Sequence, residues 1–201
     1  PGVFFSQFTG AELVADKWNL SREDLDKFAL ESHQKAAHAT ESKYFDKEIL
    51  PVEGRNAEGM NDLVMADEGI RFDASLDKLA GLNPVTEGGV ITAGNASQIT
   101  DGAAAVMVCN DAGLKKIHAN PRAEIVSISV VGDDPVFMLT GPIPASIQAL
   151  KTANLTIDDM DLYEVNEAFA PVPLAWAEDL KADRSKLNVN GGAMALGHPL
   201  G

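Results

Sequence analysis

Two short polar stretches near the end of the chain contain the side chains best suited to chemistry. His198 lies in NVNGGAMALGHPLG (188–201), and Asn166 and Glu167 lie in VNEAFA (165–170). Glycine lets a backbone turn sharply or approach another group closely, so the first stretch is suited to form the wall of a site. An imidazole there can exchange protons near neutral pH, and an asparagine amide can donate a hydrogen bond. His198 and Asn166 are therefore candidate catalytic residues.

Both residues also have a structural interpretation. A single histidine beside a glycine turn is often only a packed side chain, and Asn166 could cap the turn that follows it. The small residues of GNASQITDGAAA (94–105) could serve close packing alone. Composition and spacing leave these alternatives open.

Several common chemical motifs are absent from the sequence. It contains no G-x-G-x-x-G fingerprint, no phosphate loop ending in GK[ST] and no G-x-S-x-G elbow. His33 and His38 are five positions apart on a predicted helix, so they do not share a face for a metal ion. The single cysteine, Cys109, excludes an internal disulfide framework and a cysteine-rich zinc site. No metal site is expected.

Composition and charge exclude further classes of function. The 16 Lys and Arg against 30 Asp and Glu give a net charge of −14, which argues against sequence-independent nucleic-acid binding and against anionic membrane surfaces. An apolar content of 45% is enough for a globular core, and no run approaches the roughly 18 apolar residues of a membrane helix. The sparse use of cysteine indicates a reducing compartment, so we expect a cytoplasmic protein, or an organellar one if the source is eukaryotic.

The elements that would position the candidates alternate between strands and helices. AEIVSISVVG (123–132) predicts a strand by its β-branched content. The segments 142–155 and 171–183 predict helices with proline in the first turn. Short strands are expected within 161–170 and 187–192. This alternation indicates an α/β sheet, in which ligands gather at the carboxyl ends of the strands.

The first part of the chain predicts two helices. LSREDLDKFALESHQKAAHA (20–39) has Ser21 as its N-cap and Asp24 at the third helical position, which is a variant of the capping box. An earlier helix is expected over residues 10–18.

The middle of the chain is harder to interpret. Residues 44–84 mix acids, glycines and short apolar pairs, which indicates loops with a two-stranded ribbon. Residues 102–109 predict either a helix end or a buried strand, and Cys109 is expected to be a buried small hydrophobe.

Four stretches together resemble the thiolases, the acyl-CoA C-acyltransferases. GNASQITDGAAAVMV, GPIPAS, VNEAFA and NVNGGAMALGHPLG occur in the order and spacing of that family, and the resemblance covers nearly the whole chain. NEAF and GHP are specific as a pair, because ketoacyl synthases share the fold but place their histidines in contexts that differ from ALGHPLG. The resemblance implies an α/β fold of two layered α/β/α halves with a lid-like loop region inserted in the first half.

The resemblance divides the chain into three parts. Residues 1–87 match most of the lid region, 88–118 the end of the N-terminal half, and 119–201 the first part of the C-terminal half. We therefore expect an internal piece of a longer polypeptide, incomplete at both ends. A start at Pro1 without a signal-peptide pattern agrees with this expectation.

The family's chemistry would proceed through a cysteine acyl-enzyme. The resemblance implies thiolytic cleavage of 3-ketoacyl-CoA or Claisen condensation of acetyl-CoA. His198 matches the histidine that favours the thiolate and helps to hold the thioester oxygen, and Asn166 matches the residue that fixes a water in the same oxyanion hole. Cys109 matches neither family cysteine, so both are expected outside this chain and the isolated 201 residues are expected to be inactive.

The resemblance also implies ligands, partners and binding residues. Coenzyme A and acyl-CoA are the expected ligands, with no tightly bound cofactor, no nucleic-acid or membrane partner, and a homodimer or tetramer as the assembly. The matched substrate positions are Arg71 beside the adenine, Ala93 and Ser97 along the pantetheine arm, Met138 and Phe169 at the acyl pocket, and Ala168 beside Phe169. Arg71 could instead be a solvated counter-charge in its acidic stretch, and Met138 and Phe169 could be plain core.

Two stretches depart from short-chain biosynthetic members of the family. FFSQFTG (4–10) places Ser6 and Gln7 where those members have a His-Met-Gly stretch, and NPVTEGG (83–89) lacks a phenylalanine that they carry. These differences leave room for longer or bulkier acyl chains.

Two other functions compete with a thiolase enzyme. A non-catalytic thiolase-like carrier of acyl-CoA or lipid would keep the fold and lose catalytic residues, which the presence of His198 and Asn166 argues against. An unrelated α/β interaction module would leave the polar strand ends unexplained.

Overall fold

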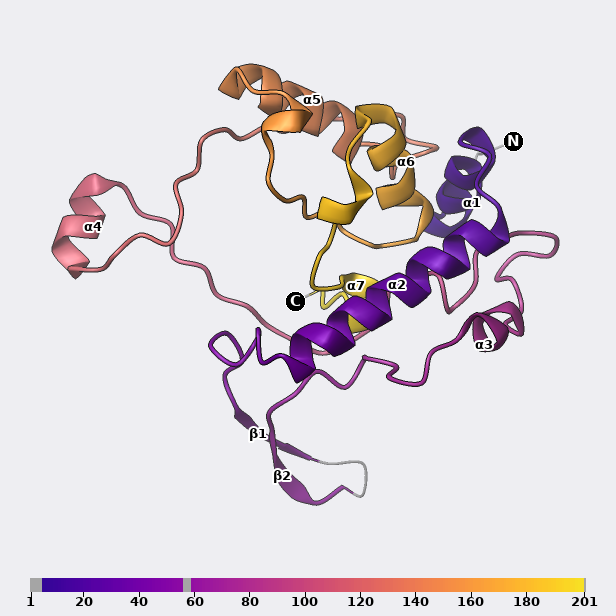
Figure 1. Ribbon diagram of the computed structural model, residues 1–201, viewed down its shortest axis with the longest axis horizontal. Helices are drawn as coiled ribbons and strands as arrows, with labels where there is room; N and C mark the ends of the chain where they lie inside the picture. Colours follow the sequence, from indigo (N-terminus) through magenta and orange to yellow (C-terminus); the bar gives the residue numbers. More distant parts are fainter. Residues whose placement is uncertain (1–4, 56–58, 201) are drawn as a thin grey trace.

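Helices dominate the computed structural model, which describes residues 5–55 and 59–200. Figure 1 shows α2 running along one side of the helical body, α5 and α6 packed together, and both the β1–β2 ribbon and α4 extending away from that body. The elements are α1 (Gln7–Lys17), α2 (Arg22–Glu41), β1 (Val52–Arg55), β2 (Asn61–Val64), α3 (Leu76–Ala80), α4 (Asp111–Ile117), α5 (Pro142–Ala153), α6 (Pro171–Leu180) and α7 (Ala193–Leu196), with 3-10 turns at Ile157–Asp159 and Arg184–Lys186. In the part of the chain that the structure describes, no helix is both long enough and apolar enough to span a membrane.

The long helix α2 begins where its capping residues predict. The Asp24 backbone N–H donates to Ser21 Oγ at 3.2 Å, and the Ser21 backbone N–H donates to the Asp24 carboxylate at 2.9 Å. The capping box is thus confirmed, and Leu25 and Phe28 behind it are buried in the core. The helix before it, α1, starts earlier than expected because the extended Ser6 serves as its N-cap and accepts the Gly10 N–H at 2.9 Å.

The core lies between α2 and the pair formed by α5 and α6. Both predicted proline-initiated helices are confirmed, and α6 is buried along nearly its whole length. Trp176 of α6 donates from Nε1 to Ser146 Oγ of α5 at 2.9 Å and meets Tyr163 edge-on at a ring separation of 5.3 Å. The resulting apolar body supports the turns that follow residues 165 and 187.

The sheet expected in the second part of the chain does not form. Residues 123–132 are irregular, and their apolar side chains are exposed, reaching 88% at Val130. Residues 102–109 are also irregular, and Cys109 is exposed rather than buried. A strand needs hydrogen-bonding partners along its length, and the described residues place no strand beside either segment. The predictions of a strand at 123–132, of regular structure at 102–109 and of a buried Cys109 are therefore wrong for this structure.

The short strands expected at 161–170 and 187–192 do not form, and an isolated bridge joins these two segments instead. Tyr163 pairs with Leu187 in one parallel bridge, in which the Tyr163 N–H donates to Lys186 O and the Asn188 N–H donates to Tyr163 O, both at 2.9 Å. The ribbon predicted within 44–84 does form, as the antiparallel pair β1–β2 with Val52 opposite Val64. The single bridge is enough to place the two candidate turns side by side.

A buried carboxylate joins α2 to both candidate turns. Glu167 is 1% exposed. Its Oε2 accepts from Ser32 Oγ at 2.6 Å and from the Met194 N–H at 3.2 Å, while its Oε1 accepts from Asn188 Nδ2 at 2.9 Å. A methyl group at Gly192 would lie 2.3 Å from the Glu167 carboxyl carbon, so only glycine fits there. This carboxylate therefore fixes the backbone next to Asn166 and the helix that leads to His198.

We predict that Glu167→Gln destabilises the full-length protein. The amide would direct an N–H₂ group at one of the donors that now faces a carboxylate oxygen. An unsatisfied buried group of this kind lowers the free energy of unfolding by about 2 kcal/mol. Urea denaturation measures the change, and the same substitution at the exposed neighbour Glu164 is the control. Equal unfolding midpoints for the two variants would contradict the role assigned to Glu167.

Candidate active site

The two candidate catalytic residues lie in direct contact. Asn166 Nδ2 is 3.1 Å from His198 Nε2. An amide nitrogen only donates, so Nε2 accepts in this arrangement. Asn166 is exposed and His198 half-buried, which leaves the pair open to a ligand.

His198 is positioned by a glycine turn and by a backbone hydrogen bond. The chain leaves α7 at Gly197, whose φ of 93° lies in the region that favours glycine. A methyl group there would also lie 2.3 Å from Thr100 Oγ1. Beyond the turn, the His198 N–H donates to Gln98 O at 3.0 Å. The glycine turn and this hydrogen bond therefore hold His198 next to Asn166.

Gln98 holds together three parts of this region. Its Nε2 donates to Gly69 O at 2.7 Å and to Met194 O at 2.8 Å, and its Oε1 lies 3.5 Å from Arg71 Nη2. Its own carbonyl accepts the His198 N–H. Sequence reasoning missed this residue, although one large polar side chain within the small residues of GNASQITDG was a signal for it.

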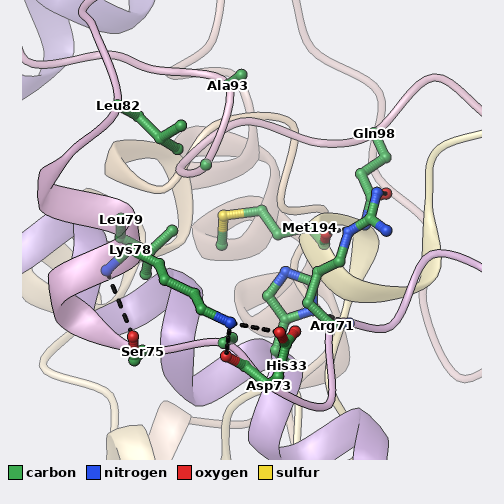
Figure 2. Close-up of a pocket in the computed structure, with 12 residues that line it drawn as sticks. His33, Arg71, Asp73, Ser75, Lys78, Leu79, Leu82, Ala93, Gln98 and Met194 are labelled. Atoms are coloured by element: carbon green, nitrogen blue, oxygen red, sulfur yellow. Dashed lines mark hydrogen bonds and ion pairs between the residues drawn. The ribbon is translucent and has the colours of Figure 1, made fainter.

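Gln98 and Met194 also line a pocket of about 340 Å³, which Asn166 and His198 do not line (Figure 2). One part of its wall is apolar, and Arg71 and Lys78 lie at its polar edge. Lys78 pairs with Asp73, and this hydrogen bond lowers the pKa of the Asp73 carboxyl. Among the described residues, no carboxylate lies within 4.0 Å of the Arg71 guanidinium, which can therefore face an anionic or aromatic ligand. The lining residues are His33, Arg71, Asp73, Ala74, Ser75, Lys78, Leu79, Leu82, Ala93, Gly94, Gln98 and Met194.

The other predicted binding residues fall into separate places. Arg71 and Ala93 line the pocket. The Ser97 N–H donates to Ala168 O at 2.9 Å, in a short ladder that also pairs Ala96 with Phe169. This ladder runs from the pocket wall to the turn that holds Asn166.

Met138 does not line the pocket and lies against α1 instead. Its φ is 43°, and its Cγ would be 3.3 Å from a methyl group on Gly10. Phe169 also reaches α1, because its ring meets that of Phe8 edge-on at 5.4 Å. Both predicted acyl-pocket residues therefore border α1 rather than the pocket.

His33 is a second pocket residue that sequence reasoning missed. The spacing from His38 was considered only for a shared metal ion, and among the described residues no group of three or more His, Cys, Asp or Glu side chains could hold one. The Arg71 backbone N–H donates to His33 Nδ1 at 3.1 Å. Burial, and then the charge of Arg71, lower the pKa of His33. No local pattern in the sequence indicates this contact, because its partners are far apart along the chain.

We predict that Gln98→Ala loosens two separate segments of the full-length protein. The side chain makes hydrogen bonds to Gly69 and Met194, each worth about 1 kcal/mol, so local opening of each segment should become roughly fivefold more frequent. Hydrogen exchange should therefore accelerate in peptides covering 68–72 and 194–199. Gln148→Ala, on the exposed side of α5, is the control. Unchanged exchange in either segment would show that Gln98 does not connect them.

Comparison with known proteins identifies the family of this chain. Residues 5–112 match the thiolase N-terminal domain and residues 119–201 the thiolase C-terminal domain. A steroid 3-ketoacyl-CoA thiolase of Mycobacterium tuberculosis is 52% identical over 196 residues, covering 98% of this chain and 47% of that protein. The human mitochondrial 3-ketoacyl-CoA thiolase is 47% identical over 192 residues, covering 95% of this chain and 48% of that protein.

Solved structures give the same result for the fold. Human mitochondrial 3-ketoacyl-CoA thiolase superposes with a TM-score of 0.91 at 47% identity, over 96% of this chain and 49% of that one. An acetyl-CoA acetyltransferase of Bacillus anthracis superposes with a TM-score of 0.92 at 39% identity, over 98% and 50%. The expected fold class, a part of the mixed α/β thiolase fold, is confirmed. The chain spans about half the length of the relatives it matches, which include mitochondrial and bacterial proteins.

Proposed function

The chain belongs to the thiolase family, and on that premise we propose that the full-length protein is an acyl-CoA C-acyltransferase. It would cleave 3-ketoacyl-CoA with coenzyme A, or run the reverse Claisen condensation. The observation that carries the proposal is the contact of Asn166 with His198. Gln98 connects His198 to a pocket whose Arg71 has no carboxylate partner among the described residues. A non-catalytic carrier would have no need for this polar pair.

The proposed reaction proceeds in two acyl transfers. A cysteine thiolate attacks the 3-keto carbon, the C2–C3 bond breaks, and the acetyl-CoA carbanion that leaves takes a proton from an acid. The thiol of coenzyme A then loses its proton, attacks the acyl-enzyme and releases the shortened acyl-CoA and the free cysteine. As the C2–C3 bond breaks, negative charge develops on the thioester oxygen of the acetyl-CoA that leaves.

His198 and Asn166 can stabilise that charge. A thioester oxygen that enters between the two side chains would replace their mutual contact; it would accept from Asn166 Nδ2, directly or through a water, and from His198 Nε2 once the ring proton lies on that nitrogen. These donors are already fixed by their backbone, which is what makes such stabilisation effective. An imidazole close to the nucleophile also favours its thiolate form.

The reacting cysteines are proposed to lie outside the 201 residues. Cys109 is exposed, two residues before α4, which Figure 1 shows far from α7. In this proposal, residues 1–87 contribute most of the lid, 88–118 the end of the N-terminal half and 119–201 the first part of the C-terminal half.

The pocket is proposed to receive coenzyme A. Arg71 would face the adenine, and Ala93 and Ser97 would follow the pantetheine arm towards His198. The human mitochondrial 3-ketoacyl-CoA thiolase is a relative solved in complex with CoA, with a TM-score of 0.89 and 46% identity. Met138, Ala168 and Phe169 would border the acyl group. Ser6 and Gln7 stand where short-chain biosynthetic members of the family have a His-Met-Gly stretch. This difference supports an acyl chain that is longer or bulkier than acetoacetyl.

We predict that His198→Ala abolishes acyl-enzyme formation in the full-length protein. The nucleophile would lose the imidazole that favours its thiolate, and the charged oxygen would lose a donor. Mass spectrometry after incubation with acetyl-CoA detects the adduct, and His38→Ala, at an exposed position on α2, is the control.

The isolated 201 residues should form no adduct either. Loss of a catalytic nucleophile costs on the order of 10⁶ in turnover. A single stable acetyl group on the isolated chain, or an undiminished burst in His198→Ala, would contradict the proposed chemistry.

We also predict that the full-length protein is a homodimer or a dimer of dimers. Apolar side chains at 99–108 and 125–130 are exposed here, and surfaces of this kind are usually covered by another part of an assembly. Light scattering at micromolar concentration measures the mass in solution. A mass equal to one polypeptide would contradict the prediction.

A further inference from the structure

An ion pair at the start of α2 binds the backbone behind one wall of the pocket. Arg22 Nε donates to Asp26 Oδ2 at 2.7 Å, one turn further along the helix. Nη2 of the same guanidinium donates to Leu79 O at 2.6 Å and to Leu82 O at 3.1 Å. These carbonyls belong to the last turn of α3 and to the loop after it. Because a guanidinium is a rigid fork, Arg22 fixes the end of α3 against the start of α2.

The second oxygen of Asp26 holds another segment of the chain. Asp26 is 3% exposed, and its Oδ1 accepts from Asn95 Nδ2 at 3.0 Å. Asn95 Nδ2 also donates to Val90 O at 3.0 Å, and Asn95 Oδ1 accepts the Thr92 N–H at 2.8 Å. The ion pair is therefore bonded on one side to the end of α3 and on the other to the turn at 90–95.

These two segments form adjoining parts of the pocket. Leu79 and Leu82 line it after α3, and Ala93 and Gly94 line it within the turn (Figure 2). They pack closely, since a methyl group on Gly94 would lie 2.5 Å from Leu82 Cδ1 and 2.6 Å from Leu79 Cδ2. The lining, as far as the structure describes it, leaves out both members of the ion pair. Their influence on the pocket therefore passes through the residues that they hold.

We propose that Arg22 and Asp26 are positioning residues for coenzyme A, which keep the apolar wall of the pocket in its binding arrangement before the ligand arrives. The inference rests on the proposed function, because coenzyme A is the ligand assigned to the pocket. Without the ion pair, the wall would adopt this arrangement only part of the time, and the apparent dissociation constant would rise by the inverse of that fraction. Bound ligand would restore the wall, so turnover at saturating coenzyme A would be kept.

A paired substitution releases the wall without leaving a buried charge unpaired. Arg22→Met/Asp26→Asn removes the guanidinium and the carboxylate together, while the new amide oxygen can still accept from Asn95 Nδ2. Loss of Arg22 alone would leave a buried carboxylate without its counter-ion, which is itself destabilising. The control is Glu23→Gln/Lys27→Met, which removes an exposed ion pair of the same spacing on the same helix.

Calorimetric titration with coenzyme A, at a temperature where every full-length variant is folded, measures the dissociation constant. We expect the paired variant to bind roughly fivefold more weakly, with turnover at saturating coenzyme A within about twofold of the parent. The control should bind as the parent does. Arg22→Lys, which keeps a charged donor near the same carbonyls, should lie between the two. Hydrogen exchange without coenzyme A should accelerate in peptides covering 77–84, where the released carbonyls lie.

A merely structural role of the ion pair predicts a different result. Partial unfolding would lower turnover and leave the affinity of the folded fraction unchanged. Parent-like affinity in the folded paired variant would therefore overturn the proposal. Loss of turnover at saturating coenzyme A with an unchanged dissociation constant would overturn it as well.

Arg71→Ala distinguishes failure of this inference from failure of the proposed function. It should weaken the binding of coenzyme A several-fold if Arg71 faces the adenine. Parent-like affinity in Arg71→Ala would remove coenzyme A from this pocket, and the proposed role of the ion pair with it. Weaker binding by Arg71→Ala beside a parent-like paired variant would leave the pocket assigned and reject only the role of Arg22 and Asp26.

Discussion

The arrangement of the candidate site depends on one buried carboxylate. Burial of a carboxylate is costly unless hydrogen bonds replace the water that it loses. Glu167 is compensated by Ser32 of α2, by Asn188 and by the Met194 backbone at the start of α7. These partners come from α2 and from residues 188–194, so the carboxylate fixes the positions of these two distant segments relative to each other. The residue before it, Asn166, thereby faces the chain that leaves α7.

Around the pocket, polar side chains make the hydrogen bonds to backbone groups that a sheet would otherwise make. The Glu12 carboxylate of α1 accepts the Val90 and Ile91 N–H groups, and Asn95 Nδ2 donates to Asp26 of α2. A strand ladder would otherwise satisfy such backbone groups. Residues 90–98 therefore keep a defined path between α1 and α2, and this path carries Ala93, Ser97 and Gln98 to their places.

How much the sequence could predict depends on the range of the interactions involved. The capping box of Ser21 and the proline starts of α5 and α6 are local, and both are found in the structure. Strand formation at 123–132 depends on partners that no local pattern reveals, and there β-branched content was misleading. The contacts of His33 and Gln98 join positions 38 and 29 residues apart, beyond the reach of periodicity or capping. The contact of Asn166 with His198 was expected because the resemblance to the thiolases places both residues in one oxyanion hole.

The same residues hold both the pocket and the pair formed by Asn166 and His198. Gln98 contacts Arg71 through its side chain and His198 through its carbonyl, and Met194 lies in the pocket wall while its N–H bonds Glu167. A ligand held beside Arg71 therefore extends along backbone that is already fixed relative to His198. In the proposed complex, the protein rather than the flexible pantetheine arm would then set the position of the thioester. Because effective covalent catalysis requires reacting atoms within about 3–3.5 Å, rigid shared supports of this kind are what the proposed acyl transfer needs.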